Sequence, residues 1–307
     1  MTANAPGQRF LLLGLGAMGY GMGQSLLRAG LAVDGFDLDP DIQRRFRAEA
    51  GLDRDLDAAA READGAILVV VNAAQVEDAL FGPRALADRL QPGSVVIGCA
   101  TIDAQKAVEF ESRLAERQIL YLDAPISGGA VRAAAGQLSI MASGTPDAFA
   151  RTEPALQAMA QAVFRLGDRA GPGSAMKSIN QLLAGIHIAA AAEAFAFGLA
   201  QGVTADQIMA VIPHCAGTSW MLENRGPYIA DGDYRPHSAV DIFVKDLGIV
   251  TGAAQGASLG LPMAEAALAR FKAASQAGLG REGDVAVVKL YARDAGLTLP
   301  PNRNKDR

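Results

Sequence analysis

Near its start the chain reads Phe10-Leu-Leu-Leu-Gly-Leu-Gly-Ala-Met-Gly19, a short apolar run followed at once by a glycine-rich turn. A short continuous apolar run ended by glycine is typical of a strand buried on both faces of a sheet. A helical pattern follows through Leu26 to Gly30, and residues 33–36 are then predicted to form a second strand, which ends at Asp37. This order of strand, helix and strand predicts a βαβ unit with parallel strands.

The glycines of this turn have the spacing Gly14-x-Gly16-x-x-Gly19, and Asp37 follows the second strand 18 residues after Gly19. A glycine cluster alone is a weak signal, but this context is the one that dinucleotide binding requires. Gly14 permits a tight turn, Gly16 lets the backbone approach a pyrophosphate, and Gly19 lets the helix pack closely on the strand. The alternative is a turn without a ligand.

Asp37 bears on the choice of cofactor. A carboxylate at this place accepts hydrogen bonds from the ribose hydroxyls of NAD and repels the additional phosphate of NADP. No Arg follows it directly, since the next residues are Leu38-Asp39-Pro40. The alternative role, capping the following helix, is more natural for Asp39 in front of Pro40. The sequence therefore predicts NAD as the cofactor.

Strand and helix patterns continue to alternate up to about residue 170. Apolar runs predict strands at 66–71, 95–98, 120–124, 138–142 and 163–166, with helices at 75–80 and 104–117. After Gly173 the strand signal disappears, and helices are predicted at 175–201, 204–212 with Thr204 as its N-cap, 241–255, 262–277 and 284–294, with a loop at 228–236. We expect a Rossmann-type doubly wound α/β domain in residues 1–170 and an all-α domain in residues 171–307.

Polar residues follow several of the predicted strands. Asn72 and Thr101 come directly after two of them, where ligands of an open α/β sheet bind, although each could instead cap a helix. Ser127-Gly128-Gly129 follows another strand and exposes a hydroxyl and backbone N–H groups suited to a carboxylate. The alternative for that loop is an ordinary turn.

Lys177 lies at the junction of the two predicted domains, where pockets preferentially form, and Asn180 follows one helical turn later. A lysine has an ordinary pKa of about 10.4, so it acts as a base near neutral pH only when burial or a nearby cation assists. Lys245 offers a second cation, unless it lies on an exposed helix face. The three histidines, His187, His214 and His237, have no spacing that indicates a metal site or a catalytic triad.

The composition narrows the class of protein. Half of the 307 residues are apolar, 20% are charged and the net charge is −5, which argues against nucleic acid as a partner. Cys99 and Cys215 are too few for a disulfide framework and fit a reducing cytoplasm. Residues 1–9 show no signal-peptide pattern. Leu182–Ala200 is apolar but contains His187 and Glu193, so we expect a helix buried in protein and no membrane span.

With these residues placed, the chain resembles the β-hydroxyacid dehydrogenase family, which includes 3-hydroxyisobutyrate and tartronate semialdehyde dehydrogenases. The matching segments are Gly14–Gly19, Asp123–Gly129, Gly171–Asn180 and Lys245–Leu247. Two departures are modest: Gln181 stands where the family often has a second Asn, and Val71-Asn72 where it often has Leu-Pro. Residues 70–76, 181–190, 219–225 and 231–247 further resemble a branch that oxidises the C2 hydroxyl of a four-carbon sugar acid, L-threonate, to a 2-oxo acid.

The resemblance implies roles for individual residues. It implies a long interdomain helix, a homodimer or homotetramer, and Lys177 as the catalytic acid and base. It further implies that NAD is held by Gly14, Gly16, Ala17, Met18, Gly19, Asp37, Val71, Asn72, Thr101 and Lys245. For the hydroxy-acid substrate it implies Ser127, Gly128, Gly129, Lys177, Asn180 and Lys245. The alternatives are a related hydroxy acid (3-hydroxyisobutyrate, tartronate semialdehyde or glycerate), an imine, or a non-catalytic NAD-sensing module.

Overall fold

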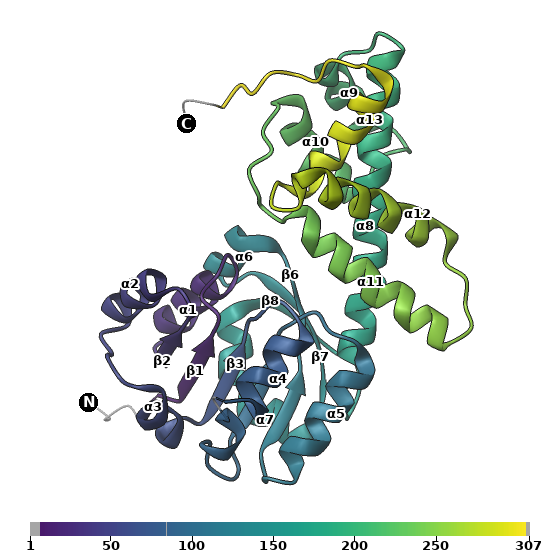
Figure 1. Cartoon of the computed structure of the whole chain (residues 1–307). Helices are drawn as coiled ribbons and strands as arrows, with labels where there is room; N and C mark the ends of the chain where they lie inside the picture. Colours follow the sequence, from purple (N-terminus) through teal and green to yellow (C-terminus); the bar gives the residue numbers. More distant parts are fainter. Residues whose placement is uncertain (1–6, 84, 305–307) are drawn as a thin grey trace. The chain divides into compact units, whose positions relative to one another are not determined.

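The computed structural model describes residues 7–83 and 85–304, which divide into two compact units (Figure 1). The first unit is Met1–Lys177 and the second is Ser178–Arg307. Residues 1–6, where the sequence shows no signal-peptide pattern, lie outside the described part.

The first unit is built on one sheet of mostly parallel strands. β1 (Arg9–Leu13) pairs in parallel with β2 (Ala32–Phe36) and with β3 (Gly65–Leu68), and β4 (Val95–Gly98) and β5 (Leu120–Asp123) continue the parallel series. β7 (Leu138–Gly144) is antiparallel to β5 and to the short β6 (Ile126–Ser127), and β8 (Ala160–Arg165) is parallel to β7. The strand order is β2-β1-β3-β4-β5-β7-β6, with β8 paired to β7.

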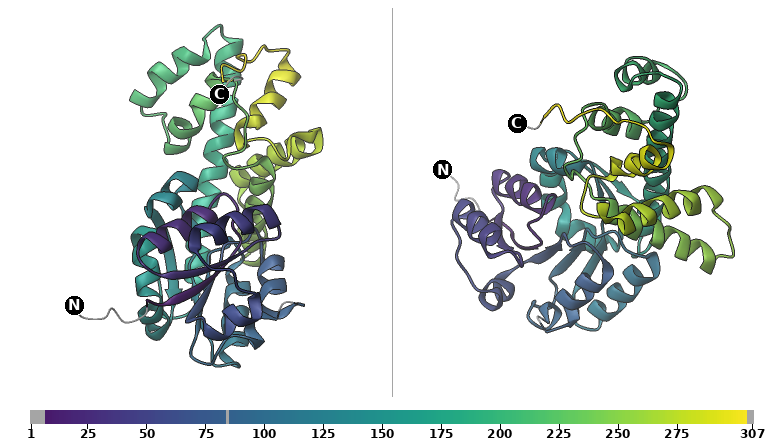
Figure 2. Two further views of the ribbon diagram at one scale, coloured as in Figure 1. Left: turned by 90° about the vertical axis from the view of Figure 1, so that its left-hand side faces the viewer. Right: turned by 45° about the horizontal axis from the view of Figure 1, so that its top comes forward.

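Helices cover both faces of this sheet (Figures 1 and 2). Phe10 and Leu12 of β1 belong to one apolar core and Leu11 and Leu13 to the other, which is why the run shows no polar alternation. The first core is covered by α1 (Gly19–Arg28), α2 (Pro40–Ala50), α6 (Gly129–Ala135) and α7 (Pro146–Met159). The second is covered by α3 (Leu56–Glu62), α4 (Ala73–Phe81), η1 (Leu86–Asp88) and α5 (Ala104–Ala115). The predicted Rossmann-type doubly wound fold is confirmed.

Some elements of this unit differ from the sequence-based prediction. β3 ends at Leu68, whereas the apolar run suggested a strand to residue 71. No element had been predicted for α3, α6, α7 or β6. β6 has only two residues and α6 begins on glycine, so neither carries a periodic pattern. α7 contains Pro154, which disguises a helix that Thr145 caps at its start.

All the elements of the second unit within its described residues are helices. α8 (Pro172–Ala200) begins in the first unit and continues into the second as a single helix. The helices that follow are α9 (Ala205–Val211), η2 (Ile212–His214), α10 (Trp220–Ala230), α11 (Val240–Gly256), α12 (Pro262–Ala274), η3 (Ser275–Leu279), η4 (Asp284–Val287) and α13 (Val288–Ala295). Phe195, Phe243 and Phe271 lie in their common core.

The helix ends of the second unit test the sequence patterns directly. Thr204 caps α9 in a reciprocal capping box with Gln207, as its position predicted. The loop predicted at 228–236 is wrong at its beginning, because α10 runs to Ala230 with Pro227 inside it. Ile229 and Ala230 are buried in the core, and this packing outweighs the helix-breaking tendency of proline.

α8 is only partly buried, in contrast to the expectation of a buried helix. Ile188 and Phe195 face the core, whereas Ile179, Leu183 and Phe197 are exposed. In the described part of the chain it is the one helix long and apolar enough to cross a membrane, and 39% of its most apolar window is buried. Length and composition alone make such a helix weak support for a membrane span, since core helices of globular proteins pass the same test.

The start of α8 is held by the buried carboxylate of Asp123, the last residue of β5. Its Oδ2 accepts from Gly171 N–H (3.0 Å) and Ser174 N–H (2.8 Å), and its Oδ1 accepts from the Ser174 hydroxyl (2.6 Å). Ser143 donates to the same carboxylate at 3.3 Å and accepts from Gly173 N–H at 2.9 Å. Burial raises the pKa of the Asp123 carboxyl, and the hydrogen bonds from Ser174 and Gly171 oppose that rise.

Gly173 allows this first turn to approach the sheet. A Cβ atom at this position would lie 2.5 Å from the carbonyl oxygen of Met141 and 2.7 Å from that of Asp123. Both contacts are with backbone atoms, which cannot rotate away. Only glycine fits here without moving α8 off the ends of β5 and β7.

Gly173→Ala should therefore destabilise the protein by about 1–3 kcal/mol, the usual cost of forcing an extra carbon into a packed region. Gly248→Ala in α11 is the matched control, because a Cβ there meets nothing within 4 Å. Alanine at that helical position should be neutral or stabilising by up to about 1 kcal/mol. Urea unfolding followed by circular dichroism measures both. Equal midpoints for the two variants would contradict the close approach.

Candidate functional site

The glycine-rich turn between β1 and α1 has the geometry of a phosphate-binding turn. Gly14 has a φ of +94°, and a Cβ there would lie 2.3 Å from the carbonyl oxygen of Val69. A Cβ on Gly19 would lie 1.8 Å from the carbonyl oxygen of Gly14, whereas one on Gly16 meets nothing within 4 Å. Met18 precedes α1 without a side-chain cap. The open position at Gly16, in front of an uncapped helix start, fits the pyrophosphate of a dinucleotide.

Asp37 lies beside this turn. Its Oδ2 accepts from Leu15 N–H at 2.6 Å and its Oδ1 from Asp39 N–H at 2.9 Å, while its own N–H donates to Gln43 Oε1 at 3.1 Å. Asp39 is the residue that caps α2, since its carboxylate accepts from Asp41 N–H and Ile42 N–H. The helix-capping role therefore belongs to Asp39, as predicted. The Asp37 carboxylate is fixed next to the glycines, at the place where a ribose would follow the pyrophosphate.

The two strand-end candidates have different local roles. Asn72 caps α4, its Oδ1 accepting from Gln75 N–H at 2.9 Å, and Val71 N–H donates to Gln75 Oε1 at 2.8 Å. Thr101 follows β4, but the cap of α5 is Asp103, which accepts from Gln105 N–H. The capping alternative thus holds for Asn72 and fails for Thr101. Contact of Val71, Asn72 and Thr101 with the cofactor stays a prediction.

The segment Ser127-Gly128-Gly129 joins β6 to α6. Gly128 has a φ of 144° and Gly129 a φ of 79°, values that favour glycine. Ser127 ends β6, and no side chain caps α6 at Gly128. The hydroxyl of Ser127 and the following backbone N–H groups remain our predicted carboxylate site.

Lys177 lies at the end of the first unit, in the first turns of α8, and is only 8% exposed. Withdrawal from water is the condition under which a lysine can exchange protons near neutral pH. Asn180 follows one turn later and belongs to the second unit.

Asn180 and Lys245 are linked within the second unit by two residues to which the sequence assigned no role. Asn180 Nδ2 donates to Gln181 Oε1 at 2.8 Å, and Gln181 Nε2 donates to Asp246 Oδ2. Asp246 Oδ1 forms an ion pair with Lys245 Nζ at 2.5 Å. The one signal in the sequence that could have indicated these two residues is that Gln181 follows Asn180 directly and Asp246 follows Lys245 directly. Asp123, quoted only as part of a motif, was missed in the same way.

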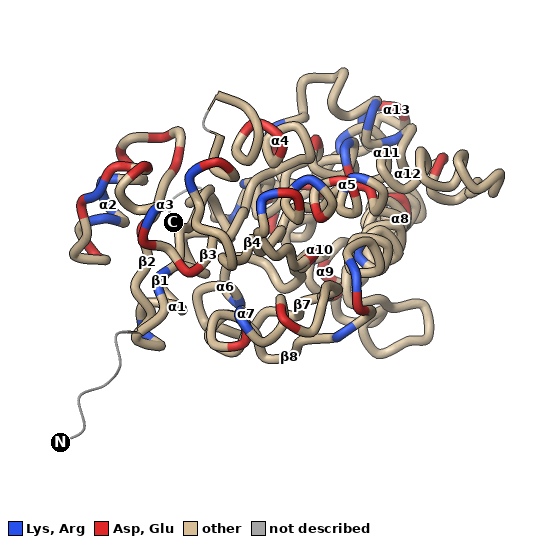
Figure 3. Tube along the Cα trace, turned by 90° about the horizontal axis from the view of Figure 1, so that it is seen from below, with Lys and Arg blue, Asp and Glu red and all other residues tan. Residues whose placement is uncertain are grey.

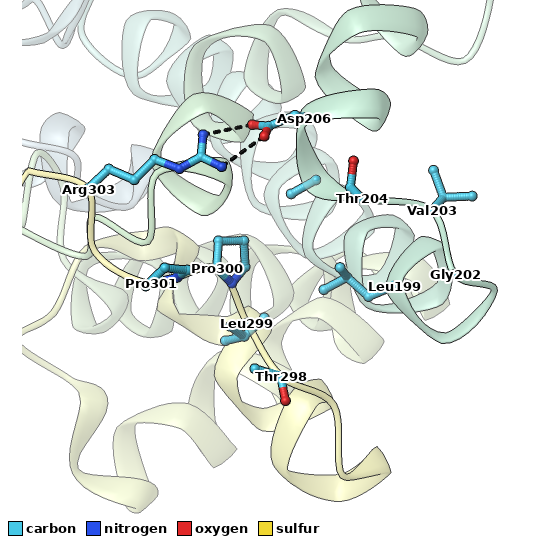
Figure 4. A pocket seen from close by; sticks show the side chains of 11 residues that line it. Leu199, Gly202, Val203, Thr204, Asp206, Thr298, Leu299, Pro300, Pro301 and Arg303 are labelled. Carbon is cyan, nitrogen blue, oxygen red and sulfur yellow. Dashed lines mark hydrogen bonds and ion pairs between the residues drawn. The ribbon is translucent and has the colours of Figure 1, made fainter.

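The described residues show other polar features that the candidate residues do not include. A hollow of about 360 Å³ lies in the second unit between Leu199–Asp206 and Thr298–Arg303, where Arg303 pairs with Asp206 at 2.8 and 2.9 Å (Figure 4). Acidic and basic residues alternate along α2 and α5 (Figure 3). Burial raises the pKa of Cys99 to about 12, so this thiol keeps its proton near neutral pH. No group of His, Cys, Asp and Glu suited to a metal lies within 7–83 and 85–304.

Comparison with known proteins covers both units. Residues 9–167 match the family model described as the NAD binding domain of 6-phosphogluconate dehydrogenase. Residues 171–291 match the model described as NAD-binding of NADP-dependent 3-hydroxyisobutyrate dehydrogenase. Both family models are therefore of nicotinamide-dependent dehydrogenases.

Individual relatives give the same assignment. L-threonate dehydrogenase of Pectobacterium atrosepticum is 49% identical over 248 residues, 81% of each chain. That of Cupriavidus necator is 51% identical over 237 residues, 77% of this chain and 79% of the relative. The solved structure of 3-hydroxyisobutyrate dehydrogenase from Salmonella typhimurium is 45% identical, with a TM-score of 0.86 over 92% of this chain and 99% of that one.

Asp37→Ser should weaken NAD binding about 10-fold, because a charged acceptor for the ribose hydroxyls is lost. It should also bring the affinity for NADP closer to that for NAD, because the repulsion of the additional phosphate disappears. Asp39→Ser is the matched control, since serine keeps the helix cap and the substitution removes the same charge two residues away. Titration with NADH and NADPH measures both preferences. An unchanged ratio in Asp37→Ser would contradict the assignment.

Proposed function

Because the chain belongs to the 3-hydroxyisobutyrate dehydrogenase-like family of β-hydroxyacid dehydrogenases, we propose that it oxidises the C2 hydroxyl of L-threonate to give 2-dehydro-L-erythronate. The chain is an NAD-dependent hydroxyacid oxidoreductase; the substrate is the part that we infer. The observation that carries it is the identity of about half of all aligned residues with L-threonate dehydrogenases.

We assign cofactor binding to residues 1–170 and substrate binding with subunit association to residues 171–307. Gly14, Gly16 and Gly19 would hold the pyrophosphate, and Asp37 the ribose hydroxyls. The open position at Gly16 and the fixed carboxylate of Asp37 support this assignment. NAD, when bound, accepts a hydride from the substrate carbon. The remaining cofactor contacts that we propose are Ala17, Met18, Val71, Asn72, Thr101 and Lys245.

For the substrate, we assign the carboxylate to Ser127, Gly128 and Gly129. Glycines with positive φ leave backbone N–H groups unobstructed by a Cβ, and such groups bind anions well. Asn180 would bind a hydroxyl group. These contacts hold the sugar acid in one orientation, which is most of what the protein contributes to a hydride transfer.

The oxidation also releases the proton of the C2 hydroxyl, and a side chain must accept this proton. As the C2–H bond breaks and a C=O bond forms, the proton of the C2 hydroxyl passes to the Nζ atom of Lys177 in its neutral form. In the reverse direction the same atom returns the proton to the oxo group. The burial of Lys177 supports this role, since a fully solvated ammonium would keep its proton. We place Lys245 at the nicotinamide end.

The second candidate substrate is 3-hydroxyisobutyrate, favoured by the solved relative that bears that name. Initial rates with L-threonate, D-erythronate, 3-hydroxyisobutyrate and glycerate, each with NAD and NADP, separate the possibilities. We expect L-threonate with NAD to have the highest kcat/KM, by about 10-fold or more over 3-hydroxyisobutyrate, because a site that pairs a second substrate hydroxyl rejects an analogue lacking it. A higher kcat/KM for another acid of the panel would make that acid the assigned substrate in place of L-threonate. Tight NAD binding without turnover would indicate a sensor.

Lys177→Ala should lower kcat by about 10²–10⁴-fold, the usual contribution of a general acid–base catalyst, while leaving NADH affinity nearly unchanged. Lys106→Ala removes a lysine that pairs with Glu109 on the surface of α5 and is the matched control. Stopped-flow measurement of NADH formation separates turnover from binding. Near-normal turnover of Lys177→Ala would refute its role.

We further propose that the enzyme acts as a cytoplasmic homodimer or homotetramer. Ile179, Leu183 and Phe197 are exposed apolar side chains on α8, and apolar surface of this kind is commonly covered by another subunit. Its mass in solution would then be two or four times that of the chain, which light scattering measures.

A further inference from the structure

The polar contacts that link Asn180, Gln181, Asp246 and Lys245 form one continuous series inside the second unit, which we call the amide chain. It runs from Asn180 Nδ2 to Gln181 Oε1 (2.8 Å), from Gln181 Nε2 to Asp246 Oδ2, and from Asp246 Oδ1 to Lys245 Nζ (2.5 Å). Gln181 is 8% exposed and Asp246 is 2% exposed. Both central members are therefore withdrawn from water, so their hydrogen bonds are not readily exchanged for bonds to solvent.

The hydrogen bonds of the amide chain are consistent with only one orientation of its two side-chain amides. A carboxylate paired with a lysine can only accept, so the NH₂ group of Gln181 must face Asp246. The carbonyl of Gln181 then faces Asn180, and the NH₂ group of Asn180 must face that carbonyl. Reversing either amide would bring two acceptors or two donors together in a buried place. The charge of Asp246 thus sets the orientation of Asn180 through Gln181.

We propose that Gln181 and Asp246 are positioning residues that fix Asn180 so that its Oδ1 atom is presented to the substrate as a hydrogen-bond acceptor. The inference rests on the proposed function, in which Asn180 binds a substrate hydroxyl. The inference adds that the Oδ1 atom of Asn180 binds the hydroxyl and that Gln181 and Asp246 hold this atom in place. An oriented acceptor selects a group that donates, which means a hydroxyl and excludes a methyl group or a second carboxylate.

The chemistry of the reaction indicates which hydroxyl this is. The C2 hydroxyl loses its proton and becomes a carbonyl, which cannot donate to Asn180 Oδ1. An acceptor in a fixed position suits a hydroxyl that keeps its proton throughout, such as the neighbouring hydroxyl of a sugar acid. The amide chain therefore determines specificity for polyhydroxy acids over acids with a single, reacting hydroxyl.

Gln181→Met and Asp246→Asn test the amide chain in a double-mutant cycle. Methionine keeps the length of Gln181 without its polarity, and asparagine keeps the shape of Asp246 but lets the Gln181 amide reverse. Each single variant should raise the KM for L-threonate about 10-fold, equal to about 1.4 kcal/mol, with a much smaller change in kcat. The double variant should be no worse than Gln181→Met, because Asp246 acts through Gln181.

The control is Gln255→Met, an exposed glutamine on α11 whose loss should leave KM unchanged. Melting temperatures report folding, and NADH titration should give unchanged affinity for Gln181→Met, which leaves the ion pair of Asp246 with Lys245 in place. If Asp246→Asn does not fold, the KM of Gln181→Met against Gln255→Met decides the question. An unchanged KM, or effects that multiply in the double variant, overturns the proposal.

The panel of hydroxy acids separates this inference from the proposed function. If the wild-type enzyme prefers another polyhydroxy acid, the L-threonate assignment fails and the cycle is run on the preferred acid. If the preferred acid carries a single hydroxyl, or if the whole panel is silent, the amide chain has no substrate hydroxyl to orient and the inference fails.

Discussion

The buried carboxylate of Asp123 ties the start of α8 to the carboxyl end of β5. A helix leaves its first N–H groups without partners inside the helix, and Gly171, before the first helical residue, has no side chain to accept from them. Asp123 supplies the acceptor from the sheet and lies at the positive end of the helix dipole. A buried charge is costly unless hydrogen bonds surround it, and here Ser143, Gly171 and Ser174 provide them. The constraint is therefore mutual: neither the carboxylate nor the helix start is satisfied without the other.

This attachment determines where Lys177 lies within the first unit. Lys177 follows Ser174 by one helical turn, so the direction of its side chain is set once Ser174 is bound to Asp123. β1 to β5 follow one parallel series, so Gly14, Asp37 and Thr101, which come after β1, β2 and β4, lie at the same edge of the sheet as Asp123. Residues separated by more than a hundred positions in the sequence thus share one edge. The parallel strands place Gly14, Asp37 and Thr101 at this edge, and the first turns of α8 place the buried Lys177 within the same unit.

The sequence alone was sufficient to predict those features whose physical cause lies in neighbouring residues. The buried strands show as apolar runs because both faces of the sheet are covered, and the turn at Gly14 needs its glycine for a close approach that any side chain would block. Asp39 and Thr204 were assigned as caps from their immediate neighbours. β6 and α6 are too short for a periodic pattern, and Pro154 and Pro227 lie inside helices that a proline ordinarily argues against. The role of Asp123 likewise depends on partners about fifty residues away.

Gln181 and Asp246 show why neighbours of a candidate residue are easily overlooked. Successive residues on a helix point about 100° apart, so Gln181 faces α11 although Asn180 beside it does not. Gly185 lies one turn beyond Gln181, and a Cβ there would lie 2.9 Å from the Cδ1 atom of Leu247, next to Asp246. The close packing of α8 on α11 at Gly185 is thus what brings the amide within reach of the carboxylate. The orientation of the partly buried Asn180 amide is in this way decided by a glycine contact inside the helical core.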